Sequence, residues 1–470
     1  MTRPIRFNAF EMNCVGHQSP GLWRHPRDRS SEYGTLAYWT DLARLLERGL
    51  FDGVFLADVV GIYDVFGGSH DAAIRHGIQV PVNDPLLVIP AMAAVTGDLG
   101  FGVTVNLSYE APYLLARRFT SLDHLTGGRI GWNVVTGYLD SAARAMGLDR
   151  QRAHDDRYDL ADEYMDVVYA LWEGSWDDDA VLRDRATGVF ADPAKVRPIR
   201  HEGEHFRTDG LHLGEPSPQR TPVIYQAGTS PKGRDFASRH AECVFVSGPS
   251  AQVIAPRVAA LRQGIAATGR SAHDILVYAL ATIVVAETDE EAAAKLAEYR
   301  SFVSYEGALT LMSGWTGVDF SRLDLDSEVR HVENDAGRSA MDNVTRADPS
   351  RVWTVREVAE HVGIGGIGPV FAGSPATVCD ALESWVEATG VDGFNLAYVV
   401  AHETFADIVD LVVPELQRRG RYRTAYEAGP LREKLFGPGR ARTAPPHPAA
   451  RHRHQAALPA EPAPHERSPS

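Results

Sequence analysis

Polar residues follow several short apolar runs. In a parallel sheet these positions are the C-terminal ends of strands, where active-site residues usually lie. Asp58 ends the run 54–57, and the segment Gln226-Ala227-Gly228-Thr229-Ser230 ends another run directly before a helical pattern. That segment combines backbone N–H groups, hydroxyls and a helix N-terminus, which together are suited to binding a phosphate. Lys232 and Arg234 would add positive charge. We therefore expect a phosphate-bearing ligand at this turn.

Further candidates lie at the ends of the other apolar runs. His154 and Tyr158 are four residues apart at the start of a helical pattern, so they share one helix face and could reach a bound cofactor. The alternative is that they are ordinary, partly buried polar residues, and Cys14 could equally be a small buried apolar side chain. The remaining strand-end candidates are Asn13, Cys14, His17, Thr104, Asn106, Asn133, Thr136 and Tyr138.

Two segments match the patterns of a zinc site and of a dinucleotide-binding site, but their predicted secondary structure does not suit either site. Residues 201–205 (HEGEH) match the H-E-x-x-H zinc pattern, which requires a helix so that both histidines share a face. Gly203 and the nearby Pro198 predict a turn instead, so we expect no metal. Residues 363–368 (GIGGIG) match G-x-G-x-x-G, but they follow a helical pattern and run into Pro369. A dinucleotide fingerprint follows a strand and opens a helix, so this segment is predicted to be a turn or mobile loop.

The elements that must position these residues alternate between strand and helix. Most of the apolar runs are continuous, which indicates strands buried on both faces in a parallel sheet. Eight such units predict an α/β fold, a (β/α)8 TIM barrel with its active site at the C-terminal ends of the strands. An open doubly wound sheet is the alternative. The eight runs are residues 6–10, 54–57, 101–107, 130–136, 223–226, 243–246, 275–285 and 393–399.

Two stretches interrupt the alternation within the predicted domain, residues 1–437, and a third follows it. Residues 177–219 are rich in Asp, Pro, Gly and His and predict an excursion containing a hairpin. Residues 302–367 form a long insertion of the kind that covers a barrel active site. From 438 to 470 the chain is dominated by Ala, Pro, Arg and His without periodicity, and we expect a disordered, dispensable tail.

Composition excludes several classes of protein. The net charge of −15 over 470 residues argues against nucleic-acid binding. The three cysteines contain no C-x-x-C pair, so neither a disulfide framework nor a cysteine-zinc site is indicated. The N-terminus lacks a signal peptide, and the longest apolar stretch, residues 277–286, is far shorter than the roughly 20 residues of a membrane span. We expect a cytoplasmic protein without a membrane partner.

Longer segments carry a family resemblance. FNAFEMNCVGH, LLERGLFDGVFLADVVGIYDV, SLDHLTGGRIGWNVVTG and TPVIYQAGTSPKGRDFASRHAECVF resemble bacterial luciferase-like flavin monooxygenases, in the nitrilotriacetate monooxygenase branch. The resemblance extends from about Ile5 to about Phe436.

The resemblance implies a homodimeric TIM barrel that binds FMN non-covalently. It implies that FMNH2 is delivered by a separate NAD(P)H:flavin reductase and that O2 is the cosubstrate. Thr104 would lie near the isoalloxazine, and Tyr158 and Ser230 would hold the phosphate. The full set of flavin contacts falls on Asp58, Thr104, His154, Tyr158 and Ser230. The family element H-x-G-x-x-F matches residues 201–206, which further weakens the zinc interpretation.

The resemblance also implies a catalytic pocket formed by Cys14, His17, Tyr63 and Tyr138. The block with Cys14, His17, Tyr63 and Gln79 looks like that of family members that oxidise long-chain alkanes. Two pocket histidines of those members are replaced here, one by Tyr138 and one near Leu311.

Tyr63, Tyr138 and the nearby Trp315 would suit a flat ring by stacking. We therefore expect oxidation of riboflavin or a related heteroaromatic in catabolism, with removal of the ribityl chain to give lumichrome. A long-chain alkane or other xenobiotic is the alternative substrate. An F420-dependent oxidoreductase on the same barrel is the alternative enzyme, and a non-catalytic flavin carrier is a third class.

Overall fold

A closed parallel barrel forms the centre of the protein. The computed structural model describes residues 4–228, 230–331, 338–345, 347–348 and 350–454. Each barrel strand pairs in parallel with two neighbours, and the last returns to the first, which closes the barrel. Its eight strands in spatial order are β1 (Arg6–Met12), β2 (Gly53–Ala57), β3 (Gly100–Asn106), β4 (Ile130–Val135), β9 (Val223–Gln226), β10 (Cys243–Val246), β11 (Leu276–Val285) and β13 (Gly393–Ala397).

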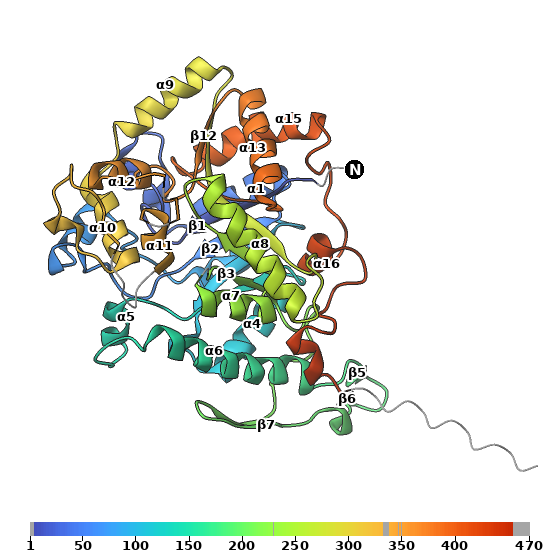
Figure 1. Cartoon of the computed structure of the whole chain (residues 1–470). Helices are drawn as coiled ribbons and strands as arrows, with labels where there is room; N and C mark the ends of the chain where they lie inside the picture. The colour runs from blue at the N-terminus through green and yellow to red at the C-terminus, as the bar shows by residue number, and fades with distance from the viewer. Residues whose placement is uncertain (1–3, 229, 332–337, 346, 349, 455–470) are drawn as a thin grey trace, which may run out of the picture.

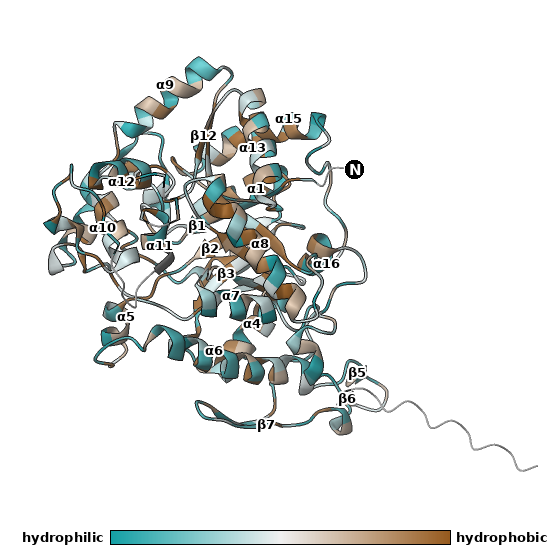
Figure 2. Ribbon diagram, in the orientation of Figure 1, coloured by the Kyte–Doolittle hydropathy of each residue, from teal (hydrophilic) through white to brown (hydrophobic). Residues whose placement is uncertain are grey.

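All eight predicted runs are barrel strands, which confirms the TIM-barrel prediction and excludes the open sheet. Every residue of β3 and of β11 is buried, because the strands face side chains inside the barrel and helices outside it. Figure 2 shows the central strands mainly in brown, whereas the β7 hairpin at the periphery is largely teal.

Helices surround the barrel (Figure 1). Among the described residues, no helix is both long enough and apolar enough to cross a membrane. The helices are α1 (Leu36–Arg48), α2 (Asp71–His76), α3 (Ile89–Ala93), α4 (Pro112–Leu125), α5 (Asp140–Ala145), α6 (His154–Tyr169), α7 (Pro231–His240), α8 (Ala251–Ala267), α9 (Asp289–Arg300), α10 (Tyr305–Thr316), α11 (Arg338–Asn343), α12 (Val355–Val362), α13 (Pro375–Thr389), α14 (Glu403–Asp407), α15 (Val413–Arg418) and α16 (Leu431–Phe436).

Both predicted insertions lie outside the barrel strands. The first contains two antiparallel hairpins, β5 (Val181–Asp184) with β6 (Val189–Ala191) and β7 (Ile199–Glu202) with β8 (Arg207–Gly210). The second contains α10, α11 and α12, which gather on one side of the molecule in Figure 1. A strand missed in the sequence, β12 (Val370–Gly373), pairs with the end of β11. This strand has only four residues, three of them half-buried, so it gives no clear apolar signal.

The C-terminal segment corrects one prediction. Disorder was expected from Pro438, yet residues 438–454 pack against the barrel. Arg442 and Arg453 both reach the buried Glu173 carboxylate, at 3.2 and 2.6 Å. His447 is buried and donates from Nε2 to the His240 carbonyl at 2.9 Å. Scattered polar anchors have no periodicity, so the sequence pattern could not reveal them. Residues 455–470 lie outside the described residues.

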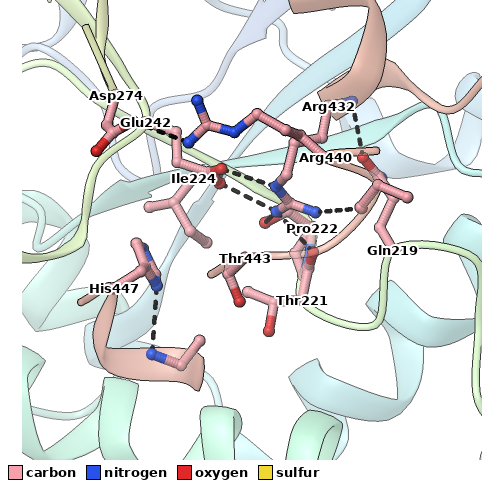
Figure 3. A network of polar contacts seen from close by, with 12 residues as sticks. Gln219, Thr221, Pro222, Ile224, Glu242, Asp274, Arg432, Arg440, Thr443 and His447 are labelled. Atoms are coloured by element: carbon pink, nitrogen blue, oxygen red, sulfur yellow. Dashed lines mark hydrogen bonds and ion pairs between the residues drawn. The ribbon is translucent and has the colours of Figure 1, made fainter. Parts of the chain in front are cut away.

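A buried ion pair fixes α16, which precedes this segment, to the N-terminal end of the barrel, opposite the candidate site (Figure 3). Arg432 on α16 donates to both carboxylate oxygens of Glu242, at 2.7 and 3.0 Å. The same guanidinium donates to the carbonyls of Thr221 and Pro222. The Arg432 guanidinium holds the pKa of the Glu242 carboxyl at about 2, despite its burial. This network ties α16 to the start of β9 and β10.

Candidate active site

A cavity of about 410 Å³ lies at the C-terminal ends of the barrel strands. Its wall is mainly apolar and aromatic, with Phe10 of β1, Phe55 of β2 and Phe245 of β10 among the lining residues. Trp315 of α10 and Ile367 also line it, so the second insertion contributes part of the wall. Mainly apolar walls with a few polar groups are typical of a cofactor or small-molecule site.

The segment predicted to bind a phosphate lines this cavity with Gln226, Ala227, Gly228 and Ser230. Ser230 is the N-cap of α7, and its Oγ accepts a hydrogen bond from the Gly233 N–H at 3.1 Å. A Cβ at Gly228 would come within 2.7 Å of the Tyr158 hydroxyl, so only glycine keeps this turn open beside the tyrosine. Lys232 pairs instead with Asp159 at 2.8 Å. Thr229 lies outside the described residues.

Two buried acceptor atoms belong to residues that line the cavity. Gln226 Oε1 at the end of β9 and Asn395 Oδ1 on β13 form no hydrogen bond with any described residue, although both residues are nearly fully buried. An unpaired buried acceptor costs about 1–3 kcal/mol, so these oxygens favour a ligand with N–H or O–H groups. With the cradle and aromatic walls, they fit a flavin mononucleotide.

A directed hydrogen-bond chain lies behind Tyr138, which is part of the cavity wall. The Tyr63 hydroxyl donates to Gln79 Oε1 at 3.0 Å, and Gln79 Nε2 donates to the His17 carbonyl at 2.9 Å. Because this commits the Tyr63 proton, Tyr138 donates to the Tyr63 oxygen across 2.8 Å. Burial raises the pKa of Tyr138 to about 12. Tyr138, which lines the cavity, is therefore a neutral phenol that offers lone pairs to a ligand.

Tyr63 is held by the second insertion. A Cβ at Gly314 on α10 would lie 1.9 Å from the Tyr63 ring, so the ring packs directly on the helix backbone. The neighbouring Trp315 side chain acts on the Tyr63 hydroxyl through a hydrogen bond that lowers its pKa, against the larger rise caused by burial. Leu311, on the same helix, is fully buried.

His17 lies directly behind the cavity wall. Its ring packs edge-on against Phe10, with 4.4 Å between ring centroids, and Nε2 lies 3.2 Å from Gln18 Nε2. Burial lowers the pKa of His17 to about 3, so the imidazole is neutral. Since a neutral imidazole nitrogen without a proton is an acceptor, Gln18 donates this bond.

The predicted residues separate into two groups. Four of them line the cavity: Tyr138, His154, Tyr158 and Ser230. The other five do not line it: Cys14, His17, Asp58, Tyr63 and Thr104. Burial raises the pKa of the Cys14 thiol well above its ordinary value, so it is a neutral thiol and a poor nucleophile. Thr104 accepts from Asn133 Nδ2 at 2.9 Å. Burial, followed by the charge of Asp84, raises the pKa of Asp58 to about 7.

Gln18 and Asn395 are among the polar cavity residues that the sequence did not single out. Asn395 is the middle residue of β13, and its signal was a polar side chain inside an otherwise apolar run. Gln18 had no such signal, because it lies in a loop beyond β1.

The two look-alike motifs have structural roles. His201 lies in β7, and its Nε2 is 2.9 Å from Glu163 Oε1, while Glu163 also accepts from the backbone of His205 and Phe206. Residues 363–368 form a turn after α12 in which Gly365 and Gly366 have φ of +73° and +76°. The turn prediction holds for both motifs.

The comparisons with known proteins decide the family. The family model described as luciferase-like monooxygenase matches residues 20–393. The chain belongs to the luciferase-like monooxygenase family. It is accordingly an enzyme of the flavin-dependent monooxygenase class, and the family uses reduced flavin and O2.

Several relatives are similar over nearly the whole chain. The dimethyl-sulfide monooxygenase of Hyphomicrobium sulfonivorans is 51% identical over 96% of this chain and 94% of its own. The long-chain alkane monooxygenase of Geobacillus thermodenitrificans is 48% identical over 96% and 99%. A riboflavin lyase structure with modified FMN and riboflavin is 38% identical, covers 96% and 100%, and has a TM-score of 0.90. Nitrilotriacetate monooxygenase component A of Aminobacter aminovorans, at 34% identity over 88% and 93%, confirms the resemblance to its branch.

Proposed function

We propose that this enzyme is an FMN-dependent, two-component monooxygenase that inserts one oxygen atom into a small, mainly apolar organic molecule. The observation that carries the proposal is the phosphate cradle around Ser230 opening into an aromatic cavity at the strand ends. A relative whose name designates it as component A supports a separate NAD(P)H:flavin reductase as the source of FMNH2. We also propose a homodimer.

The residues of this chain would hold and shield the flavin. Ser230 and Tyr158 would bind the phosphate, with His154 beside them, while Gln226 and Asn395 would accept hydrogen bonds from the cofactor. Asp58 and Thr104 lie behind the cavity wall, so they would influence the flavin ring only through the residues that they contact. Bound FMNH2 supplies the electrons that reduce O2, one oxygen atom entering the substrate and the other leaving as water.

The Tyr138 hydroxyl oxygen would accept a hydrogen bond from a protonated oxygen in the cavity and hold it toward the substrate. Tyr138 keeps its own proton and donates it in the hydrogen bond to the Tyr63 oxygen, so Tyr138 does not release a proton at neutral pH. The apolar walls would exclude water, which limits wasteful loss of reduced flavin. Cys14, His17 and Gln79 would fix the position of the tyrosine pair from behind.

The size of the cavity bears on the substrate. Pockets of roughly 300–1,000 Å³ accommodate one drug-sized ligand, and the cavity of about 410 Å³ lies in the lower part of that range. This favours a substrate smaller than riboflavin, so we propose a compact apolar molecule in place of the expected ribityl-bearing one. Aromatic lining by Phe10, Phe245 and Trp315 still suits a small heteroaromatic ring.

The test is aerobic turnover under 18O2, with FMNH2 regenerated by a generic flavin reductase. Dimethyl sulfide, hexadecane, quinoline and riboflavin would be offered, and products analysed by mass spectrometry. We expect one 18O atom in the product of a compact substrate and no turnover under nitrogen. Equal turnover without O2 would contradict the proposal and favour a hydride-transfer oxidoreductase. Lumichrome from riboflavin would contradict the size argument.

A further inference from the structure

Gln18 lies across the cavity from the phosphate cradle. It follows β1 in the chain and lines the cavity, and β1 is four strands away from β9 in either direction around the closed barrel. Since β9 leads into Ser230, a flavin whose phosphate is bound there would have Gln18 toward the opposite end. Only a small fraction of Gln18, 7%, is exposed.

The side-chain amide of Gln18 has little freedom. One N–H of Nε2 is given to His17 Nε2. The oxygen points at the glycine turn, because a Cβ at Gly366 would lie 2.1 Å from Gln18 Oε1. A larger residue at position 366 would therefore displace the amide, and the left-handed backbone there also favours glycine.

The glycine turn is itself fixed to the loop that carries Gln18. The Gly365 N–H donates to Ser19 Oγ at 3.0 Å, and Ser19 Oγ donates to the Tyr398 carbonyl at 3.2 Å. At Gly365 a Cβ would lie 1.7 Å from Thr282 Oγ1 of β11, so the turn packs closely on the barrel. Two loops from distant parts of the sequence thus orient one amide.

We propose that Gln18 donates its second amide N–H to a hydrogen-bond acceptor on the substrate, and so selects compact apolar molecules that carry one acceptor atom. This rests on the proposed monooxygenase function, whose substrate class it narrows. Among the described residues the Gln18 amide makes no other hydrogen bond, so with its oxygen at Gly366 and one N–H on His17 a single donor is left for the cavity.

The surroundings make this donor selective. Phe10, Leu280 and Ile367 line the same cavity and offer no side-chain hydrogen bond. A buried donor without a partner is costly, so a ligand lacking an acceptor is rejected more strongly than the bond alone would imply. A heteroaromatic nitrogen or a carbonyl oxygen satisfies the donor, whereas a hydrocarbon does not.

The test compares quinoline with naphthalene, which have the same bicyclic shape but differ in one ring nitrogen. Binding of each to the FMN-loaded protein would be measured by calorimetry. We expect the wild type to bind quinoline roughly tenfold more tightly. Gln18→Leu should abolish this preference by weakening quinoline alone, and Gly366→Ala should reduce it with Gln18 still present. Affinity for FMN should not change in Gln18→Leu.

Gln263→Leu, the same substitution on the exposed side of α8, is the matched control and should retain the preference. Equal or immeasurably weak binding of both compounds by the wild type would overturn the proposal, as would an unchanged preference in Gln18→Leu. Loss of FMN affinity in Gln18→Leu would mean that Gln18 binds the flavin instead. Failure of the monooxygenase proposal itself would be seen separately, as wild-type protein that does not bind FMN or does not incorporate 18O.

Discussion

The Tyr138 hydroxyl lies 2.8 Å from the Tyr63 hydroxyl, and the Gln79 amide beyond it determines which of the two donates. Tyr63→Phe removes the acceptor for the Tyr138 proton, so Tyr138 would turn its proton into the cavity. We expect the yield of oxygenated product per O2 consumed to fall about tenfold, with FMN affinity unchanged. Tyr113→Phe, which removes a hydroxyl bonded to the Leu211 carbonyl at the surface, should leave the yield unaltered.

Ser230→Ala should weaken FMN binding about tenfold or more, because it would remove both the proposed phosphate contact and the N-cap of α7. Ser374→Ala is a matched control: Ser374 also caps a helix, α13, that begins with proline. Both variants should lose about 1 kcal/mol of stability, while Ser374→Ala keeps its FMN affinity. Equal FMN affinity in the two variants, measured by fluorescence titration, would remove Ser230 from the site.

Asp58 should make the stability of the protein depend on pH. Burial raises its pKa from 3.8 to about 7, so the folded state holds this proton more tightly than the unfolded chain. The resulting stabilisation is complete below about pH 4 and is lost as the pH rises through 7.

The asparagine of Asp58→Asn cannot ionise. The free energy of unfolding of this variant, relative to that of the wild type, should therefore rise by about 2 kcal/mol between pH 5 and pH 8. Asp84→Asn keeps a side-chain oxygen to accept from the Leu86 N–H but removes the nearby charge. In that variant the loss of stability caused by ionisation of Asp58 should occur at lower pH. If the difference in free energy of unfolding between wild type and Asp58→Asn did not change with pH, the raised pKa of Asp58 would be disproved.

Truncation after Gly437 should now be harmful, contrary to the expectation from composition. It would leave the fully buried Glu173 carboxylate without Arg442 and Arg453. Removing the partners of a buried charge costs about 3 kcal/mol or more, so we expect a large fall in melting temperature. Truncation after His454 keeps both arginines and should retain the wild-type melting temperature. Equal stability of the two truncations would show that the packed segment contributes nothing.

The sequence by itself determined the barrel and the cavity segment that we propose to bind the phosphate. Continuous apolar runs can be satisfied only by strands buried on both faces, and the segment from Gln226 to Ser230 carries its chemistry locally. Only the tertiary structure decided the rest. Gln18 and Gly366, or Arg453 and Glu173, lie hundreds of residues apart, and their contacts depend on how loops close over the barrel ends. The direction of the Tyr138–Tyr63–Gln79 chain likewise arises from three separate segments, because each donor's orientation is set by the next acceptor in space.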